Sequence, residues 1–221
     1  GRDGPAAQRM QAAQEAQGVA SMARYTGPRG RRDRRAGVML SSMRKNPLEK
    51  KPYPPGEHGR GRRRQTEFGL RLMEKQKARW YYGVSEKQFR RAYDRATRMQ
   101  GVSGENLLRL MELRMDNIVY RMGFSTSRPQ ARQLVVHGHF QLNGRKHNVP
   151  SAILKPGDVI TVKEKSRDLV PIQNAVENVV AVPPWLEADH DNFTGRLLHT
   201  PGRDEIDTPV EEQLIIEFYS R

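Results

Sequence analysis

Two arginines, Arg128 and Arg132, stand four residues apart in a segment whose pattern predicts a helix. Ser127 and Gln130 form a capping-box pattern at its start, and Pro129 is tolerated in the first helical turn. The free amides and dipole of a helix N-terminus favour phosphate, and an arginine adds a two-pronged donor. The spacing therefore indicates contact with nucleic-acid phosphates; the alternative is an ordinary amphipathic helix with solvated arginines.

A β-hairpin turn is predicted shortly after this helix. The dipeptide Asn143-Gly144 is typical of a two-residue hairpin turn, and it carries Arg145 and Lys146 beside it. A helix and a hairpin with this charge form a surface suited to the groove or junction of a structured RNA, where shape and phosphates dominate recognition. We therefore expect RNA contact from both elements.

Histidine and carboxylate side chains near this segment are predicted to play supporting parts. His137 and His139 stand at the end of the helix without a carboxylate close by in the sequence, so we expect them beside phosphate rather than around a metal ion. Asp116 is flanked by arginines, and we expect it to orient Arg114 or Arg121 through a salt bridge rather than to act as a general base.

Catalytic and cofactor-binding motifs are absent from the sequence. It contains no Walker A loop, no dinucleotide-binding glycine pattern, no His-Glu-x-x-His and no Gly-x-Ser-x-Gly. It also contains no cysteine, which excludes a disulfide scaffold, a cysteine-ligated metal and a thiol nucleophile. No apolar run approaches the roughly 18–20 residues that span a membrane, and no signal-peptide core is seen. We expect no cofactor, no metal, no small-molecule substrate and no membrane partner.

Charge is distributed unevenly along the 221 residues, whose formal net charge is +14. Residues 22–100 hold 23 basic and 7 acidic side chains, whereas residues 168–221 hold 3 basic and 11 acidic ones. A cationic segment of this kind gains salt-sensitive affinity for a polyanion, although charge runs can also be solvated or disordered faces. Aromatic residues interleaved with the charge favour the binding interpretation: Tyr25, Tyr53, Trp80, Tyr81 and Tyr82.

The first 65 residues show little helical periodicity. Residues 1–21 are rich in Ala and Gln without an apolar stripe, so we expect a disordered or loosely docked extension. Residues 22–65 are predicted to form an irregular basic arm that orders against a partner. Within it, residues 24–35 are Gly- and Arg-rich, and the three prolines of residues 51–59 exclude a helix there.

Periodicity and turn signals predict an α+β fold for the rest of the chain. Helices are expected over residues 66–83, 85–99, 103–123, 128–137 and 168–180. Strands are expected at residues 140–142, 159–162, 193–199 and 214–219. We predict a mainly helical, basic N-terminal domain and a small RNA-binding domain with a helix pair and a short antiparallel sheet, with the C-terminal tail packing back. The predicted domains are residues 66–102, completed by about 181–221, and residues 103–180.

Several motifs resemble a known family. Residues 114–124, 127–139, 142–144 and 155–158 are similar to the RNA-binding module named after small-subunit ribosomal protein four, a fold of alpha-L type whose core here is residues 114–165. Other RNA-binding proteins also carry that module. Further motifs narrow the resemblance to the ribosomal protein four family itself, in its cysteine-free branch: residues 23–28, 54–59, 74–77, 82–90 and 212–221.

The resemblance implies a structural constituent of the small ribosomal subunit, located at a ribosome in the cytoplasm of a bacterium or in an organelle. It implies direct binding to the 5′ domain of 16S-type ribosomal RNA, nucleation of assembly of the subunit body, and neighbours among other small-subunit proteins. Ribosomal protein five would be one of these neighbours, at an interface tied to decoding accuracy, and mRNA would pass near its entry path.

Residue patterns and resemblance together predict a set of RNA-contacting side chains. In the arm they are Arg24, Tyr25, Arg29, Arg31, Lys51, Tyr53, His58, Arg60, Arg62, Arg63 and Arg64. In the helical region they are Lys75, Lys77 and Arg79. In the RNA-binding module they are Arg114, Arg121, Ser127, Arg128, Arg132, Gln133, His137, His139, Asn143, Arg145 and Lys146.

Two other functions use the same module. An RNA-modifying enzyme carrying it as an appendage needs a separate catalytic domain of about 150 residues, and the remaining sequence is too short and too basic for one. A free-standing RNA-binding regulator or chaperone has no need of the long basic arm. Stoichiometric cofractionation with small subunits separates the ribosomal protein from both.

Overall fold

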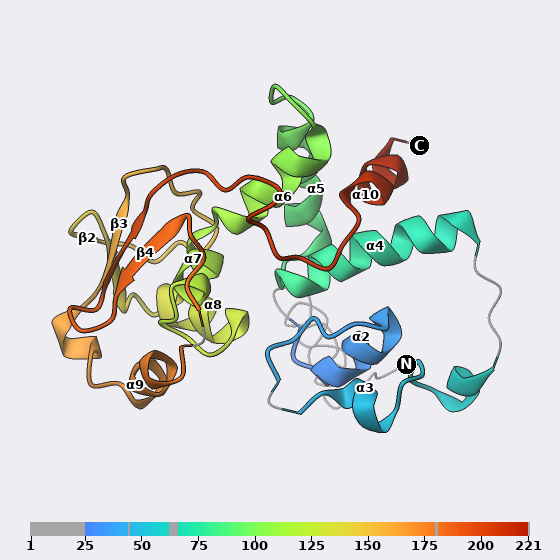
Figure 1. Cartoon of the computed structure of the whole chain (residues 1–221), viewed down its shortest axis with the longest axis horizontal. Helices are drawn as coiled ribbons and strands as arrows, with labels where there is room; N and C mark the ends of the chain where they lie inside the picture. Colours follow the sequence, from blue (N-terminus) through green and yellow to red (C-terminus); the bar gives the residue numbers. More distant parts are fainter. Residues whose placement is uncertain (1–24, 44, 62–65, 180, 221) are drawn as a thin grey trace, which may run out of the picture.

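Two lobes and an arm make up the molecule, whose computed structural model describes residues 25–43, 45–61, 66–179 and 181–220. Figure 1 shows a helical lobe beside a lobe built on a β-sheet, with the arm beneath the first helix of the helical lobe. The predicted α+β class is confirmed. The extension predicted for residues 1–21 lies outside the described residues, as do Arg24 and Arg62, Arg63 and Arg64 of the arm.

The helical lobe combines three consecutive helices with the last helix of the chain. Its elements are α4 (Glu67–Tyr81), α5 (Glu86–Ala96), α6 (Ser103–Glu112) and α10 (Glu212–Tyr219). The Thr66 hydroxyl accepts a hydrogen bond from the Gly69 amide, which satisfies a free donor at the start of α4. Phe89, Leu107 and Ile215 are fully buried in the lobe's core, so α10 completes a core begun more than a hundred residues earlier.

The sheet lobe packs helices against a five-stranded antiparallel sheet of order β2-β1-β3-β5-β4. Its strands are β1 (Phe140–Leu142), β2 (Arg145–Lys146), β3 (Val159–Val162), β4 (Leu186–Asp189) and β5 (Thr194–Leu197). Its helices are α7 (Met115–Arg121), α8 (Arg128–Val136), the short 3-10 helix η2 (Glu164–Ser166) and α9 (Val170–Glu177). Asn143 and Gly144 form the predicted hairpin turn with positive φ angles of 51° and 77°.

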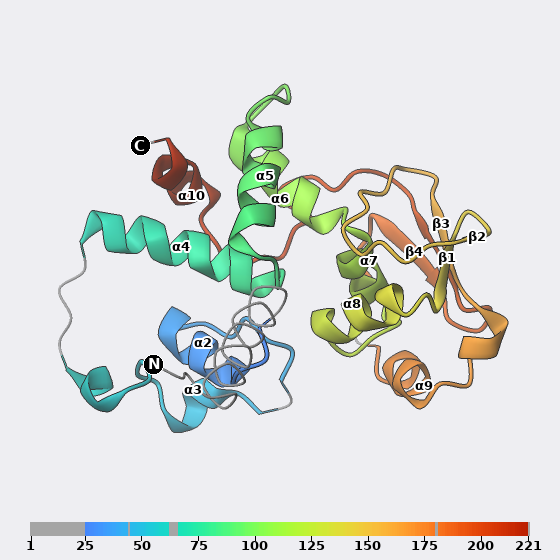
Figure 2. The same ribbon diagram turned by 180° about the vertical axis from the view of Figure 1, so that it is seen from behind.

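A close approach explains one glycine of the sheet. A Cβ atom at Gly195 in β5 would lie 2.5 Å from the sulfur of Met122, at the end of α7. Gly195 also pairs with Ile160 of β3, so the sheet and α7 meet at a point where only a hydrogen fits. Figure 2 shows the sheet from the opposite side, with α7 and α8 between it and the helical lobe.

The arm contains more helix than we predicted. Helix α2 (Arg29–Ala36), the short α3 (Pro47–Lys50) and a 3-10 turn, η1 (Glu57–Arg60), replace the irregular chain expected there. Arginine has a high helix propensity, and stacking supplies what an apolar stripe would otherwise provide. The Arg32 guanidinium carbon lies 3.4 Å from the centroid of the Tyr25 ring and 5.4 Å from that of Trp80.

The single helix predicted over residues 103–123 is wrong, because α6 and α7 are separate. Arg114 between them is extended, with φ −69° and ψ 139°, and forms a β-bridge with Ile153. The Leu113 carbonyl accepts a hydrogen bond from the Leu154 amide, and the Met115 amide donates to the Ala152 carbonyl. A pairing partner far along the chain therefore breaks a helix that hydrophobic periodicity alone would continue.

Other predicted boundaries and caps also change. Residues 214–219, predicted as a strand, lie in α10, and α5 ends at Ala96 rather than near Met99. Ser127 precedes α8, but among the described residues its side chain makes no capping hydrogen bond to this helix. Instead the Gln130 side-chain oxygen accepts hydrogen bonds from the amide and hydroxyl of Thr126. Strand β4 was not predicted.

Candidate nucleic-acid interface

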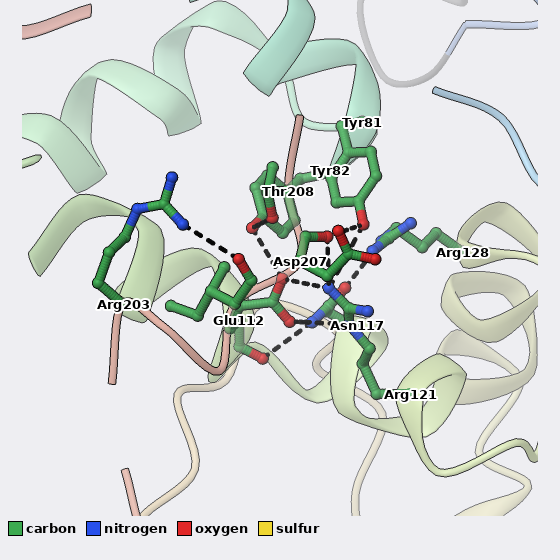
Figure 3. Close-up of polar contacts among 10 residues, drawn as sticks. Tyr81, Tyr82, Glu112, Asn117, Arg121, Arg128, Arg203, Asp207 and Thr208 are labelled. Atoms are coloured by element: carbon green, nitrogen blue, oxygen red, sulfur yellow. Dashed lines mark hydrogen bonds and ion pairs between the residues drawn. The ribbon is translucent and has the colours of Figure 1, made fainter. Parts of the chain in front are cut away.

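A polar network joins the two lobes around Glu112, at the end of α6. Its carboxylate is fully buried and accepts hydrogen bonds from three residues, which surround it in Figure 3. Arg121 Nη2 donates to Oε1 at 2.8 Å and Arg121 Nε to Oε2 at 3.1 Å. Asn117 Nδ2 donates to Oε2 at 2.6 Å, and the Tyr82 hydroxyl donates to Oε1 at 2.8 Å. A buried carboxylate with this many donors is compensated for its lost hydration.

Electrostatics around Glu112 follow from burial and pairing. Burial by itself raises the pKa of Glu112, but the charge and hydrogen bonds of Arg121 outweigh it, and the pKa lies below its ordinary value. Burial, together with the charge of Glu112, raises the pKa of Tyr82 well above its usual range. Burial lowers the pKa of Arg121, but Glu112 more than reverses this and the net pKa is raised. All three groups therefore keep their ordinary charges near neutral pH.

Arg128, predicted as a phosphate contact, is a buried part of this network. Only 7% of its surface is exposed. Its guanidinium carbon lies 3.8 Å from the ring centroid of Tyr81 and 4.5 Å from that of Tyr120. Its Nε donates to Asn117 Oδ1 at 2.8 Å, and its buried Nη2 has no hydrogen-bond partner among the described residues. The structure thus places Arg128 between the lobes, because aromatic rings from α4 and α7 enclose its side chain.

Arg114 and Arg132 share Asp116, which acts as an ion-pair partner. Arg114 donates two hydrogen bonds to the Asp116 carboxylate, at 3.0 and 2.7 Å, and is 4% exposed. Arg132 Nη1 reaches the same carboxylate at 3.2 Å while 30% of its side chain stays exposed. The predicted salt bridge from Asp116 to Arg114 is therefore confirmed, whereas Arg121 pairs with Glu112. Of Arg114 and Arg132, only Arg132 has a side chain exposed enough to contact an external phosphate.

The predicted cations of α4 are paired within the protein. Lys75 is 5% exposed, and its ammonium group donates to Glu86 at 3.0 Å. Arg79 donates to the same carboxylate at 2.9 Å, and Lys77 pairs with Glu74. These contacts neutralise three cations that were expected to bind RNA. Lys75 is also buried and does not face the outside of the protein.

The remaining predicted side chains lie on the surface in two groups. In the arm, Tyr25, Arg29, Arg31, Lys51, His58 and Arg60 are exposed and Tyr53 is half-buried. In the sheet lobe, Gln133, His137, Asn143, Arg145 and Lys146 are exposed, and Ser127 and His139 are half-buried. They form two basic patches, one on the arm and one on the sheet lobe.

Sequence reasoning missed two cations with clear structural positions. Arg34 Nε donates to the carbonyls of Lys51 and Tyr53, and its Nη2 donates to the carbonyl of Pro54. It therefore holds the proline-rich part of the arm against α2. Lys163 follows β3, and its amide donates to the carbonyl of His139. Lys163 lies beside His139 because of the register between β1 and β3, and the sequence does not reveal that register.

Grouped metal ligands and membrane-spanning helices are both lacking in the described part of the chain. There, no three His, Asp or Glu side chains are grouped so as to hold a metal ion. Of the helices described, none combines the length and the apolar character needed to cross a bilayer.

Comparison with known proteins gives matches along the chain. A family model described as the Ribosomal protein S4/S9 N-terminal domain matches residues 24–112, and a model of the S4 domain matches residues 113–160. A protein of Rubrobacter xylanophilus named small ribosomal subunit protein uS4 is 88% identical over 200 residues, which is 90% of this chain and 100% of that protein. Proteins of the same name from Dictyoglomus thermophilum and a Thermoanaerobacter species are 53% and 50% identical, again over 90% of this chain and the whole of each relative.

Proposed function

Because the chain belongs to the family of small ribosomal subunit protein uS4, we propose that it binds the 5′ domain of 16S-type ribosomal RNA directly and nucleates assembly of the subunit body. In this role the protein performs no chemical step. Its task is to hold a folded RNA in one geometry, and its place is the ribosome.

The observation that carries the proposal is the division of the cations into paired interior groups and unpaired surface groups. Interior cations such as Lys75, Arg114 and Arg121 each meet a carboxylate. The exposed cations that pair with no carboxylate of the described residues include Arg29, Arg31, Arg35, Lys51, Arg60, Arg145 and Lys146. Unpaired surface cations are free to neutralise phosphates and release condensed counterions.

Contacts that join the parts carrying the two basic patches support shape-selective binding. The Arg128 network joins the lobes, and the hydroxyls of Ser42 in the arm and Tyr120 in the sheet lobe lie 2.8 Å apart. A preorganised body loses less conformational entropy when it binds. RNA junctions of the matching shape would then be favoured over RNA of the same charge and a different fold.

The domain organisation that we propose divides the chain at Glu112–Leu113. Leu107 and Leu110 of α6 pack in the core of the helical lobe, whereas Met115 packs in that of the sheet lobe. The helical domain would then comprise residues 66–112 and be completed by residues 201–220. The RNA-binding domain would comprise residues 113–200 rather than 103–180.

Protein neighbours are proposed for the acidic part of the chain. Residues 168–221 hold 11 acidic and 3 basic side chains, and like charge disfavours RNA there. We assign this surface to other small-subunit proteins. Ribosomal protein five is the neighbour that the family resemblance implies, at an interface that contributes to decoding accuracy close to the path of entering mRNA.

Binding of the full chain to a transcript of the small-subunit 5′ domain, measured by filter retention over a range of salt concentrations, tests the proposal. We expect tight binding that weakens steeply with salt, and weaker binding to an unrelated folded RNA of equal length. Equal affinity for both RNAs would contradict shape-selective recognition, and absence of binding would contradict the function itself. Protection of transcript nucleotides from hydroxyl radicals would locate the contacts.

A further inference from the structure

Four protonatable side chains converge where α8 ends and the sheet begins. His137 directly follows α8, His139 precedes β1, Lys146 ends β2 and Lys163 follows β3. Figure 2 shows these three strands side by side at the edge of the sheet lobe. They surround Gly138, and we call this group the histidine–lysine cup.

The geometry of Gly138 shows how tightly the cup closes. Its φ of 74° is a left-handed conformation that ends the helix. A Cβ atom placed on Gly138 would lie 2.9 Å from Cε and 3.8 Å from Nζ of Lys146, and 3.9 Å from Nζ of Lys163. Two ammonium groups therefore approach one point from two strands, and any side chain at position 138 would fill the space between them.

Positive charge in the cup is unopposed by the described carboxylates. Lys146, Lys163 and both histidines make no ion pair with any carboxylate in the described ranges. Glu164, the nearest carboxylate in the sequence, is exposed on η2 and forms none either. Mutual repulsion of cations held together in this way is relieved when an anion binds between them.

The imidazole of His139 lies close to two of these groups, His137 and Lys163. The His139 Nδ1 lies 3.0 Å from the hydroxyl of Ser166, and its ring centroid lies 6.0 Å from that of His137. Burial, His137 and Lys163 together lower the pKa of His139. The groups that face His139 are thus His137 from α8, Lys163 from β3 and the uncharged Ser166 from η2. A phosphate in the cup would offset the repulsion and favour the protonated ring.

We propose that the histidine–lysine cup binds one backbone phosphate of the RNA and that this binding is coupled to uptake of a proton by the histidine pair. The inference rests on the proposed RNA-binding function and adds a ligand group, Lys163, and a regulation by pH. Since the anion raises the proton affinity of the cup, protons must raise its affinity for the anion by the same factor. RNA affinity should therefore increase as the pH falls through the histidine range and level off where the histidines are neutral.

Affinity of the full chain for the 5′-domain transcript at fixed salt, measured from pH 6 to pH 8, tests the coupling. One proton taken up per binding event changes the affinity by at most about tenfold per pH unit. The double variant H137N/H139N should bind with little dependence on pH. The control variant H199Q, which removes an exposed histidine paired with Glu205 in the acidic part of the chain, should keep the full dependence. An equal pH dependence in H137N/H139N and the wild type would overturn the proposal.

A variant of Lys163 tests whether its charge, and not only its packing, acts on the histidines. Replacing Lys163 by Met removes a cation beside His139, so the midpoint of the pH profile should shift to higher pH and the maximal affinity should fall. The matched control K155M removes an exposed lysine near the opposite end of β3 and should leave the midpoint unchanged. Equal midpoints for K163M and the wild type would contradict the assignment of Lys163.

Dimethyl phosphate, a diester that stays monoanionic over this pH range, tests the cup without RNA. In NMR titrations of the full chain, it should raise the pKa of His139, and this rise should disappear in K146M/K163M. An unchanged His139 pKa would overturn the cup as a phosphate site. Tight but pH-independent RNA binding would overturn the proton coupling alone, whereas failure to bind RNA at any pH would overturn the proposed function.

Discussion

Arg128 of the sheet lobe lies against Tyr81 of the helical lobe, with 3.8 Å between the guanidinium carbon and the ring centroid. The guanidinium stacks on a second ring, that of Tyr120, and donates to Asn117. A positive charge is therefore enclosed where the two cores meet. In a chain with so many arginines at its surface, this one is part of the interior.

Replacing Arg128 by Ala should lower the free energy of unfolding by about 2–4 kcal/mol, because a desolvated cation–π contact and a hydrogen bond to a charged group are both lost. Urea denaturation at neutral pH measures this. The control R132A removes a partly exposed ion pair and should cost less than about 1 kcal/mol. A folded R128A protein should keep the salt dependence of RNA binding, and a shallower dependence would return Arg128 to the RNA interface.

Replacing Glu112 by Gln should destabilise the protein by about 3–5 kcal/mol, since Arg121, whose side chain is only 15% exposed, loses its counter-ion. The pKa of Glu112 is lowered in the folded state, so its contribution is complete above its ordinary value of 4.5 and is lost as the pH falls through the lower folded value. Urea denaturation from pH 3 to pH 7 should show a smaller acid-dependent loss in E112Q. The exposed control E164Q should match the wild type, and an E112Q curve parallel to the wild-type curve would exclude this contribution.

Replacing Arg34 by Ala should release the proline-rich part of the arm from α2. Three carbonyls, of Lys51, Tyr53 and Pro54, lose their guanidinium donor. At about 1 kcal/mol for each hydrogen bond, local opening should become at least tenfold more frequent. Limited proteolysis within residues 51–60 measures this opening. The exposed neighbour Arg35 provides the control. Equal cleavage rates for R34A and R35A would contradict a role of Arg34 in holding residues 51–54 against α2.

Replacing Arg145 by Met should reduce the salt dependence of RNA binding without affecting stability. Each phosphate contact that is lost lowers the slope of log affinity against log salt by about 0.7–0.9. Arg60 of the arm should behave in the same way, and the double variant should show the sum. Lys75, which is buried against Glu86, serves as the comparison: K75M should lower stability and leave the slope unchanged. Slopes unchanged in R145M and R60M would remove both side chains from the interface.

Local signals in the sequence predicted most of the elements. Helices were expected to start at Thr66 and Ser85, and these two side chains cap α4 and α5; the Asn143-Gly144 turn has the predicted geometry. Each depends on residues within a few positions of one another. The α+β class and the return of the C-terminal segment to the helical lobe were also predicted.

The exposure of individual arginines was not predictable, because it depends on partners distant in the chain. Nothing near Arg128 in the sequence reveals that Tyr81 will enclose it, and helical spacing alone places Arg128 and Arg132 on the same surface. The break at Arg114 likewise requires Ile153, and α2 is stabilised by stacking on Tyr25 and Trp80. Hydrophobic periodicity carries information about residues within one helix or strand, and not about contacts between elements that are distant in the sequence.

The helical lobe is assembled from two stretches of chain that the sheet lobe separates. Residues 113–197 supply the buried core of the sheet lobe without interruption, whereas Ile215 of α10 completes the core of α4, α5 and α6. During synthesis from the amino end, the nascent chain therefore has all it needs for the sheet lobe while the earlier helices still expose apolar surface. Closure of the helical lobe has to wait until the last helix has emerged.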